Sequence, residues 1–275
     1  CDAGILTMIA STICDLGPSV PPSVVIVLAQ IIMTFDKPTP ILIEQATEIL
    51  NSIFSIDSAA ESGLIIASHL ARLSKDFLPA LSECGALNLA ERALQSDVQL
   101  IKARALDFIG NVCRHTSLPN DYLDAFVQLL MENVQENNVD CQKLAAFALG
   151  NILYWTPDAA SLIINDSDAI RVLLDSKDPK VVDNAAMVLG NMVRKSSKYV
   201  KLLIGNGSLE DLLRTVNNDE LQGKTILALA SFCQYDEGRG FLKLKKAQTI
   251  ISKFTNSPNE RIQRYAKNII SALSS

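Results

Sequence analysis

The side chains of this sequence that are best suited to binding chemistry belong to asparagines that follow a glycine at a fixed spacing. The pairs Gly110-Asn111, Gly150-Asn151 and Gly190-Asn191 recur with a period of 40 residues. An asparagine amide offers both a hydrogen-bond donor and an acceptor, so one side chain can pair with the N–H and the C=O of a bound peptide. The repetition therefore predicts a row of amides that bind a polypeptide backbone.

Side chains one helical turn away from these asparagines are expected on the same helical face. Arg114, Tyr154 and Arg194 each follow a pair by one turn, and Phe147 precedes Asn151 by one turn. Phe147 with Asn151 resembles the pairing of an aromatic residue with asparagine in peptide-binding armadillo proteins. The predicted partner-binding residues are therefore Asn111, Asn151, Asn191, Phe147, Arg114, Tyr154 and Arg194.

The glycine–asparagine pairs also have a purely structural interpretation. A glycine in the middle of a helix costs up to about 1 kcal/mol relative to alanine, so it usually has a packing reason. In this interpretation the glycines let neighbouring helices touch, and the asparagines satisfy nearby carbonyl groups. The sequence leaves both interpretations open.

No catalytic or cofactor-binding motif accompanies the asparagines. The sequence contains neither a Gly-x4-Gly-Lys-Ser/Thr phosphate loop nor a Gly-x-Gly-x-x-Gly turn that opens a helix. His69 and His115 stand alone, and the six cysteines form no C-x-x-C motif and no zinc-ligand spacing. We therefore expect no catalytic residue, no metal and no cofactor, and we expect that this chain is not an enzyme.

The elements that must position these residues are helices. A period of about 40 residues is the length of a two- or three-helix unit and predicts an α-solenoid. Apolar residues recur at helical spacing through 122–134 and again through 144–152, with a break at Asn137-Asn138. Further helices are expected over 5–16, 23–35, 41–54, 64–73, 98–115, 180–195, 220–234, 247–254 and 260–273. The predicted fold is all-α, a right-handed α-solenoid of about six to seven repeats.

The repeat is clearest after residue 84. Residues 1–84 are interpreted as degenerate helical repeats that form an N-terminal cap, because a terminal repeat must present one face to water. Residues 85–275 hold the regular repeats, and no low-complexity linker separates them from the cap. We expect one continuous solenoid domain. Because the chain opens at Cys1 within helical sequence, we also expect it to be a piece of a longer protein.

The regular unit has a Gly-Ala-Leu start, a Leu-Leu helix, a short break and a long alanine-rich helix that ends near asparagine. The segments Ala145–Asn151 and Ala185–Asn191 resemble the third and longest helix of the armadillo repeat. In armadillo proteins, asparagines on that helix line a concave groove and hold an extended peptide. The resemblance implies that this chain binds a protein or an extended peptide in such a groove.

A longer run within residues 141–242 carries a closer resemblance. In order, it contains Phe147–Asn151, Leu173–Asp175, Asp178–Lys180, Asn184–Ala186, Leu189–Ser196, Leu203–Gly207, Leu212-Leu213, Lys224–Leu229 and Arg239–Leu242. This run is similar to the carboxy-terminal armadillo/HEAT region of the Fused family of serine/threonine kinases and their Unc-like pseudokinase relatives. The resemblance implies an upstream kinase or pseudokinase domain and a scaffold role in cilium or flagellum assembly, Hedgehog-type signalling or cytokinesis.

Charge and composition narrow the partners and the compartment. The net charge of −5 argues against a general nucleic-acid binder. Residues 239–275, however, carry eight bases and one acid, which form either a solvated helix face or a docking site for an acidic partner or another part of the same protein. The longest apolar run, from Val24 to Phe35, is too short to span a bilayer, so no membrane contact is expected. Cys113 and Cys233 stand in apolar helical runs, where a reduced cysteine acts as a small hydrophobe, and this favours a reducing, intracellular compartment. We expect a cytoplasmic protein that is associated with the cilium, the flagellum or the cytoskeleton.

Three functions compete on this sequence. The first is a non-catalytic interaction and regulatory scaffold of a Fused-like kinase. The second is an armadillo cargo adaptor that binds extended basic peptides, which requires acidic groove residues where Arg114 and Arg194 stand instead. The third is a nucleic-acid-binding HEAT-like array that uses the basic end, whose binding would fall steeply with salt.

Overall fold

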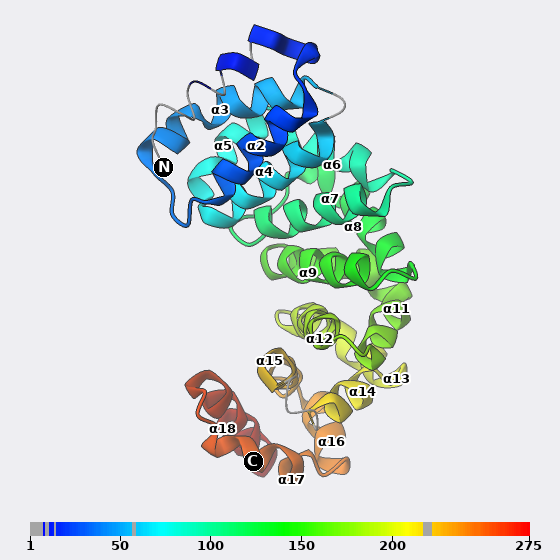
Figure 1. The fold of residues 1–275 in the computed structure, drawn as a ribbon. Helices are drawn as coiled ribbons and strands as arrows, with labels where there is room; N and C mark the ends of the chain where they lie inside the picture. The colour runs from blue at the N-terminus through cyan, green and yellow to red at the C-terminus, as the bar shows by residue number, and fades with distance from the viewer. Residues whose placement is uncertain (1–7, 9–10, 14, 57–58, 217–221) are drawn as a thin grey trace. The chain divides into compact units, whose positions relative to one another are not determined.

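The computed structural model describes residues 8, 11–13, 15–56, 59–216 and 222–275 of the chain. Within these ranges every regular element is a helix, so the prediction of an all-α repeat fold is confirmed (Figure 1). The contacts divide the chain into two compact units, residues 1–116 (unit 1) and 117–275 (unit 2), and each unit is described by itself.

Unit 1 is built from helices that match most of the predicted segments. The helices are α2 (Pro22–Met33), α3 (Pro40–Phe54), α4 (Ala60–Leu73), α5 (Leu78–Glu83), α6 (Ala86–Leu94) and α7 (Gln99–Val112), with 3₁₀ turns at Gly17–Ser19 and Lys75–Phe77. Helices α4 and α7 pack along each other, and Phe77 and Phe108 are fully buried in the core. Of the predicted helix over 5–16, residues 8, 11–13, 15 and 16 are described and are helical, and the other residues lie outside the described ranges.

Unit 2 contains one two-helix repeat followed by three-helix repeats. The first repeat is α8 (Asn120–Gln135) and α9 (Val139–Trp155). The following repeats are α10 (Ala160–Ile163), α11 (Ser167–Val172) and α12 (Pro179–Val193); then α13 (Val200–Gly205), α14 (Ser208–Thr215) and α15 (Gln222–Phe232); and finally α16 (Asp236–Leu244), α17 (Ala247–Ile251) and α18 (Glu260–Ser274). Short 3₁₀ turns occur at Pro157–Ala159, Ile164–Asp166, Leu173–Asp175, Ser197–Tyr199 and Ser252–Asn256.

The last helix of each repeat in unit 2 packs against the last helix of the next repeat. Helices α9, α12, α15 and α18 therefore form a row in chain order (Figure 1). Small buried side chains let these helices approach closely, and they include Ala145, Ala185 and Ala228. We call these four helices the third helices of unit 2.

The third helices begin at side-chain caps that recur with the repeat. Asn138 accepts a hydrogen bond from the backbone N–H of Cys141 at 3.0 Å, and Asp178 accepts one from Lys180 at 2.8 Å. Asn259 caps α18 in the same way. Such caps satisfy backbone donors that have no partner inside the helix, and each contributes about 1 kcal/mol. They explain why α9 begins directly after the predicted break at Asn137-Asn138. They also explain why α12 and α18 begin at or next to the predicted helix starts at residues 180 and 260.

The division into units lies at a different place from the boundary drawn on the sequence. The sequence predicted a change in repeat regularity at 84/85, whereas the compact units meet at 116/117, so α5, α6 and α7 belong to unit 1. The two boundaries describe different properties, because one concerns sequence regularity and the other concerns contacts. The degenerate cap over 1–84 therefore stays a prediction.

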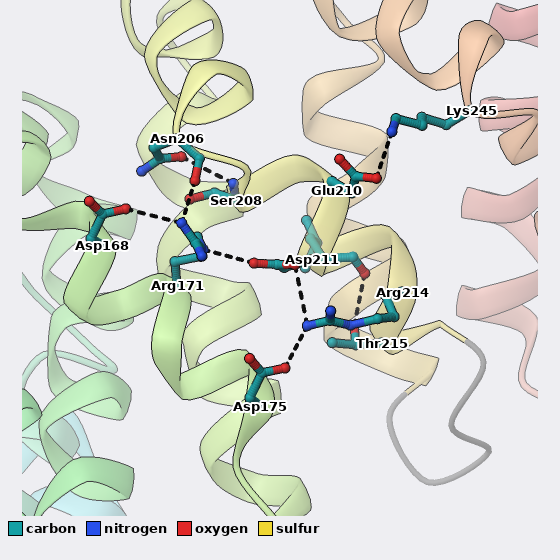
Figure 2. Close-up of polar contacts among 11 residues, drawn as sticks. Asp168, Arg171, Asp175, Asn206, Ser208, Glu210, Asp211, Arg214, Thr215 and Lys245 are labelled. Atoms are coloured by element: carbon teal, nitrogen blue, oxygen red, sulfur yellow. Dashed lines mark hydrogen bonds and ion pairs between the residues drawn. The ribbon is translucent and has the colours of Figure 1, made fainter.

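Charged side chains tie the second helices of successive repeats together in unit 2 (Figure 2). Arg171 of α11 donates from Nε to Asp211 Oδ2 of α14 at 2.8 Å, and Arg214 contacts both Asp211 at 3.2 Å and Asp175 at 2.5 Å. Lys245, which follows α16, donates to Glu210 Oε1 at 2.5 Å. We call this set the second-helix ladder: Asp168, Arg171, Asp175, Glu210, Asp211, Arg214 and Lys245.

Candidate functional site

An open cavity of about 500 Å³ runs along the third helices of unit 2. Helices α9, α12, α15 and α18 all contribute to its wall, and Met187, Leu227 and Ile262 are among its apolar lining residues. We call it the third-helix cavity. Its polar and aromatic lining residues are Tyr154, Asp183, Asn191, Arg194, Lys224, Ser231, Asn259, Arg261 and Tyr265.

Arg194 and Tyr154 form a flat, partly exposed platform at this cavity. The guanidinium carbon of Arg194 lies 4.0 Å from the centroid of the Tyr154 ring, and Arg194 Nη2 donates to the Tyr154 carbonyl oxygen at 2.5 Å. The guanidinium is attracted by the electron-rich ring face. Tyr154 remains 48% exposed, so its ring is available to a ligand. The structure thus brings together two residues that the sequence predicted for the site.

Asn191 lines the cavity and also holds two repeats together. Its Nδ2 donates to the carbonyl oxygen of Gly150 on the preceding third helix at 2.8 Å. Asn184, two turns earlier on α12, makes the equivalent bond to the Lys143 carbonyl oxygen at 2.8 Å. Asn191 is half-buried, so it has both a structural contact and an accessible surface. The hydrogen bond that the structural interpretation requires is thus present at this residue, and its part in partner binding stays a prediction.

Asn151 and Phe147 lie on α9 but do not line the third-helix cavity. Phe147 instead lines a neighbouring cavity of about 380 Å³ together with Lys143, Lys180, Asn184 and Lys224. Asn151 is half-buried and makes contacts within the chain. Their part in partner binding stays a prediction.

Asn111 and Arg114 belong to unit 1, where they form a polar cluster. Asn111 Nδ2 donates to Ser68 Oγ at 2.9 Å, and Arg114 Nη1 donates to Asn111 Oδ1 at 3.3 Å. Ser68 in turn donates to Asp107 Oδ2 at 2.5 Å. Only 3% of Asn111 is exposed, and both ends of its amide are engaged inside unit 1. This geometry gives Asn111 a structural role between α4 and α7.

Gly150 and Gly190 have the packing reason that the structural interpretation requires. A Cβ atom added to Gly190 would lie 2.8 Å from both Cα and Cβ of Ala228 on the next third helix. A Cβ added to Gly150 would meet the flexible end of the Met187 side chain at 2.2 Å. Real side chains do not approach so closely, so Gly190 in particular sets the contact between α12 and α15.

Asp183 and Lys224 place opposite charges in the cavity wall, and the sequence analysis did not identify them. Burial raises the pKa of the Asp183 carboxyl above its ordinary value, and the Lys224 ammonium opposes that shift. Burial likewise lowers the pKa of Lys224, and Asp183 opposes that shift. Lys224 Nζ donates to Asn184 Oδ1 at 2.6 Å.

A search of the sequence for side chains at the repeat spacing could have found some of the cavity-lining residues that the sequence analysis did not identify. Asp183 precedes Asn191 by two helical turns on α12, and Lys224 follows Asn184 by one 40-residue period. Arg261 and Tyr265 carry no such signal, because no glycine–asparagine pair marks the last repeat. These two residues become part of the site only through the packing of α18 against α15.

The other reactive side chains are engaged in the fold. Burial raises the pKa of Cys113 and of Cys233 to about 12, so both thiols stay protonated at neutral pH. His69 is 5% exposed and contacts the Phe35 carbonyl oxygen at 2.9 Å. Across the described ranges, His, Cys, Asp and Glu nowhere gather into a group of three that could hold a metal ion. None of the helices described is long and apolar enough to cross a membrane.

Known sequences resemble this chain only in part. No protein-family model matches it. It is 27% identical over 234 residues, 77% of this chain, to the "Serine/threonine-protein kinase TIO" of Arabidopsis thaliana. It is also 27% identical over 134 residues, 46% of this chain, to "Importin subunit alpha-1b" of Oryza sativa subsp. japonica. The chain spans 17% of the length of the kinase and 25% of the length of the importin subunit.

Solved structures establish the fold class. A designed armadillo repeat protein superimposes with a TM-score of 0.70 at 22% identity, covering 84% of this chain and 99% of that chain. Another designed armadillo repeat protein, in complex with the peptide (KR)4, gives a TM-score of 0.68 at 20% identity with the same coverage. The chain is thus an α-solenoid with the architecture of armadillo repeat proteins. Membership of the Fused family stays a prediction.

Proposed function

We propose that this chain is a non-catalytic scaffold module whose third-helix cavity binds an extended peptide segment of a partner protein. The observation that carries the proposal is one open cavity that crosses four successive third helices and is lined by Asn191, Tyr154 and Arg194. An extended peptide advances about 3.3 Å per residue, so a short segment suffices to follow this row of helices, which pack at roughly 8–10 Å.

The similar proteins support a binding role. One designed armadillo repeat protein with this fold is in complex with the peptide (KR)4, and solenoids of this kind offer extended surfaces for partners. The similarity to an importin subunit is consistent with the same role and keeps a cargo adaptor as the alternative function.

We further propose that the module belongs to a larger protein that carries a Fused-like serine/threonine kinase or pseudokinase domain. The similarity of 77% of this chain to part of a serine/threonine-protein kinase supports this assignment. A scaffold attached to a kinase would bring that kinase to its partners in the cytoplasm, at the cilium, the flagellum or the cytoskeleton. Sequencing the complete reading frame tests the assignment. A reading frame that encodes no kinase or pseudokinase domain upstream of this chain contradicts it.

Selection from a random peptide library tests the binding role directly. The full chain is immobilised, and the affinity of each selected peptide is compared for the unchanged chain and for Tyr154→Ala and Asn191→Ala. Since one net hydrogen bond contributes about 1 kcal/mol, we expect each substitution to weaken binding by about fivefold.

The control is Leu244→Ala, because Leu244 is 83% exposed on α16 and does not line the cavity. Its affinity for the selected peptides should equal that of the unchanged chain. Peptides that bind all variants equally well, or a library that yields no binder, contradict the proposed function.

A further inference from the structure

The charged side chains at the third-helix cavity specify the chemistry of the peptide. We propose that this cavity selects an extended acidic segment, in which carboxylate side chains meet Arg194, Lys224 and Arg261. This inference rests on the proposed function, because it assumes that a peptide binds there, and it adds the class of peptide. It is the opposite of the basic peptide (KR)4 that accompanies one designed armadillo repeat protein.

The cavity is lined by more cations than anions. Arg194, Lys224 and Arg261 line it, whereas Asp183 is the one acidic residue among its described lining residues. The neighbouring cavity, which shares Asp183 and Lys224, adds Lys143 and Lys180 to the same row of helices. A wall with this excess of positive charge attracts anionic ligands and repels cationic ones.

Two of the three cavity cations, Arg194 and Lys224, contact neutral oxygens instead of carboxylates. Arg194 donates to the Tyr154 carbonyl oxygen, and Lys224 donates to the Asn184 side-chain oxygen. Over the described ranges no carboxylate oxygen lies within 4 Å of the charged nitrogens of Arg194, Lys224 or Arg261. Asp183 acts on Lys224 from a longer distance. These positive charges are therefore not neutralised by direct ion pairs.

The second-helix ladder shows that the same unit pairs its cations elsewhere. Arg171, Arg214 and Lys245 each lie within 3 Å of a carboxylate oxygen of the adjacent repeat (Figure 2). The chain has 30 acidic and 25 basic residues, so carboxylates are not scarce. Since acids are available, yet none of those that the structure describes pairs with the cavity cations, the described cavity wall retains positive charge that a ligand can neutralise.

Among the residues that the structure describes, Lys143 is the one surrounding cation that forms ion pairs. It lies 2.5 Å from Asp140 and 4.0 Å from Asp178. This pairing places the unneutralised charge toward Lys224, Arg194 and Arg261. The ligand carboxylates should therefore contact α12, α15 and α18 more strongly than α9.

The apolar lining of the cavity adds a second requirement. Met187, Leu227, Ile262 and Tyr265 line the same space as the cations. In an extended peptide successive side chains point to opposite faces. A segment that carries acidic residues among small or apolar ones can therefore place carboxylates on the cations and still cover the apolar wall.

Fluorescence anisotropy with labelled synthetic peptides tests the inference on the full chain. The probes are (Glu-Ala)4, its neutral counterpart (Gln-Ala)4, its basic counterpart (Lys-Ala)4, and single-stranded oligo-dT. At low ionic strength we expect (Glu-Ala)4 to bind at least about tenfold more tightly than (Gln-Ala)4, because unscreened charges steer and hold an anionic ligand. We expect (Lys-Ala)4 to bind more weakly than both.

A matched pair of charge reversals on α18 locates the site. Arg261 lines the cavity, whereas Lys267, on the same helix, is exposed and does not line it. Arg261→Glu should weaken (Glu-Ala)4 binding by about tenfold, and Lys267→Glu, with the same change in net charge, by less than about twofold. Equal losses for the two variants overturn the inference, because they indicate attraction by net charge alone.

The remaining outcomes separate this inference from the proposed function. If (Gln-Ala)4 or (Lys-Ala)4 binds more tightly than (Glu-Ala)4, the acidic preference is wrong, while peptide binding itself survives. If oligo-dT binds more tightly and displaces the peptide, the cations serve nucleic acid and the inference fails. If (Glu-Ala)4 does not bind but peptides selected from a library do, only the acidic preference is overturned.

Discussion

The two charged surfaces of unit 2 use the same residue types in different ways. On the second-helix ladder, arginine and lysine side chains meet carboxylates of the adjacent repeat, and Asp211 bridges Arg171 and Arg214. On the third-helix cavity, Arg194 and Lys224 meet a carbonyl and an amide oxygen of a neighbouring repeat. Both surfaces join successive repeats, but among the described residues the ladder cations are ion-paired, whereas the cavity cations are not.

We infer from this difference that the ladder stabilises the stacking of repeats, whereas the cavity serves the binding of a ligand. Exposed ion pairs contribute only about 0–1 kcal/mol each, so the ladder stabilises repeat stacking in small increments. In the cavity, neutral acceptors hold the cations in place without cancelling their charge. We therefore expect substitutions on the ladder to change stability and substitutions in the cavity to change binding.

The largest effect is expected where the third helices touch. Gly190→Ala should destabilise the chain by about 1–3 kcal/mol, because its new Cβ collides with the Ala228 backbone and pushes α12 from α15. It should also weaken peptide binding by widening the cavity. Thermal unfolding and anisotropy with a selected peptide measure the two effects.

Gly150→Ala is the matched control for Gly190→Ala. Its Cβ meets the end of the Met187 side chain, which can move to another rotamer. We expect a loss of less than about 1 kcal/mol, part of which is offset by the better helix propensity of alanine. Equal destabilisation by the two substitutions would show that the backbone contact at Ala228 does not limit the approach of the helices.

The next effect tests the ladder. Asp211→Asn removes the charge that receives both Arg171 at 2.8 Å and Arg214 at 3.2 Å, and the Asp211 side chain is only 16% exposed. We expect a loss of about 1 kcal/mol in stability and an unchanged affinity for (Glu-Ala)4. Urea unfolding and anisotropy on the same sample check both parts. A change in affinity would remove the distinction between the two surfaces.

A smaller effect tests the charge balance of the cavity. Burial raises the pKa of Asp183, so the native state disfavours its ionised form and stability falls as pH rises from the ordinary aspartate pKa through the raised native value. Asp183→Asn should therefore raise the melting temperature at pH 7 by about 1–2 °C and have no such effect well below the ordinary pKa. It should also tighten (Glu-Ala)4 binding by about threefold, because a repulsive charge is lost.

Melting curves of both proteins across the acidic range provide the check on Asp183. The difference between them must shrink as pH falls, since protonated aspartate and asparagine are both neutral. A variant that melts below the unchanged chain at pH 7, with a deficit that disappears at low pH, would mean that ionised Asp183 stabilises the fold. The acidic preference of the cavity would then need another explanation.

The sequence predicted the repeat architecture because its signals are local. Apolar residues at helical spacing and capping residues such as Asn138 and Asp178 act within a few positions along the chain. The expected helix over 180–195 corresponds to α12 at Pro179–Val193. The segment over 247–254 instead divides into α17 and a 3₁₀ turn at Ser252–Asn256, because helix ends tighten easily.

The site was predicted less completely because its geometry depends on distant partners. Asn111 and Asn191 follow the same local pattern, yet Asn111 bonds to Ser68 and Asn191 bonds to the Gly150 carbonyl oxygen. The hydrogen-bond partner of each asparagine depends on which group the adjacent helix places beside it. The 40-residue spacing alone does not specify that group. Tyr154 and Arg194 were identified because consecutive repeats place them at equivalent positions.

The smallest expected effect concerns a turn that lies outside the cavity. A substitution there should change the stability of the chain and leave peptide binding unchanged. Gly85 precedes α6 and Gly207 precedes α14 in the left-handed conformation, with φ of 70° and 85°. The equivalent residue before α17 is Lys246, with φ of 54°. Such a φ strains any residue that has a Cβ, by about 1–2 kcal/mol.

Lys246→Gly should therefore stabilise the chain, although glycine also gains freedom in the unfolded state. The two contributions leave a net gain of about 0.5 kcal/mol. Lys246→Ala is the control, since it removes the same charge but keeps the Cβ and should give no gain. Because Lys246 does not line the third-helix cavity, the affinity for (Glu-Ala)4 should stay the same in both variants. If both weaken binding equally, the positive charge of the C-terminal repeat acts on the ligand as a whole, and the cavity alone does not determine the preference for acidic peptides.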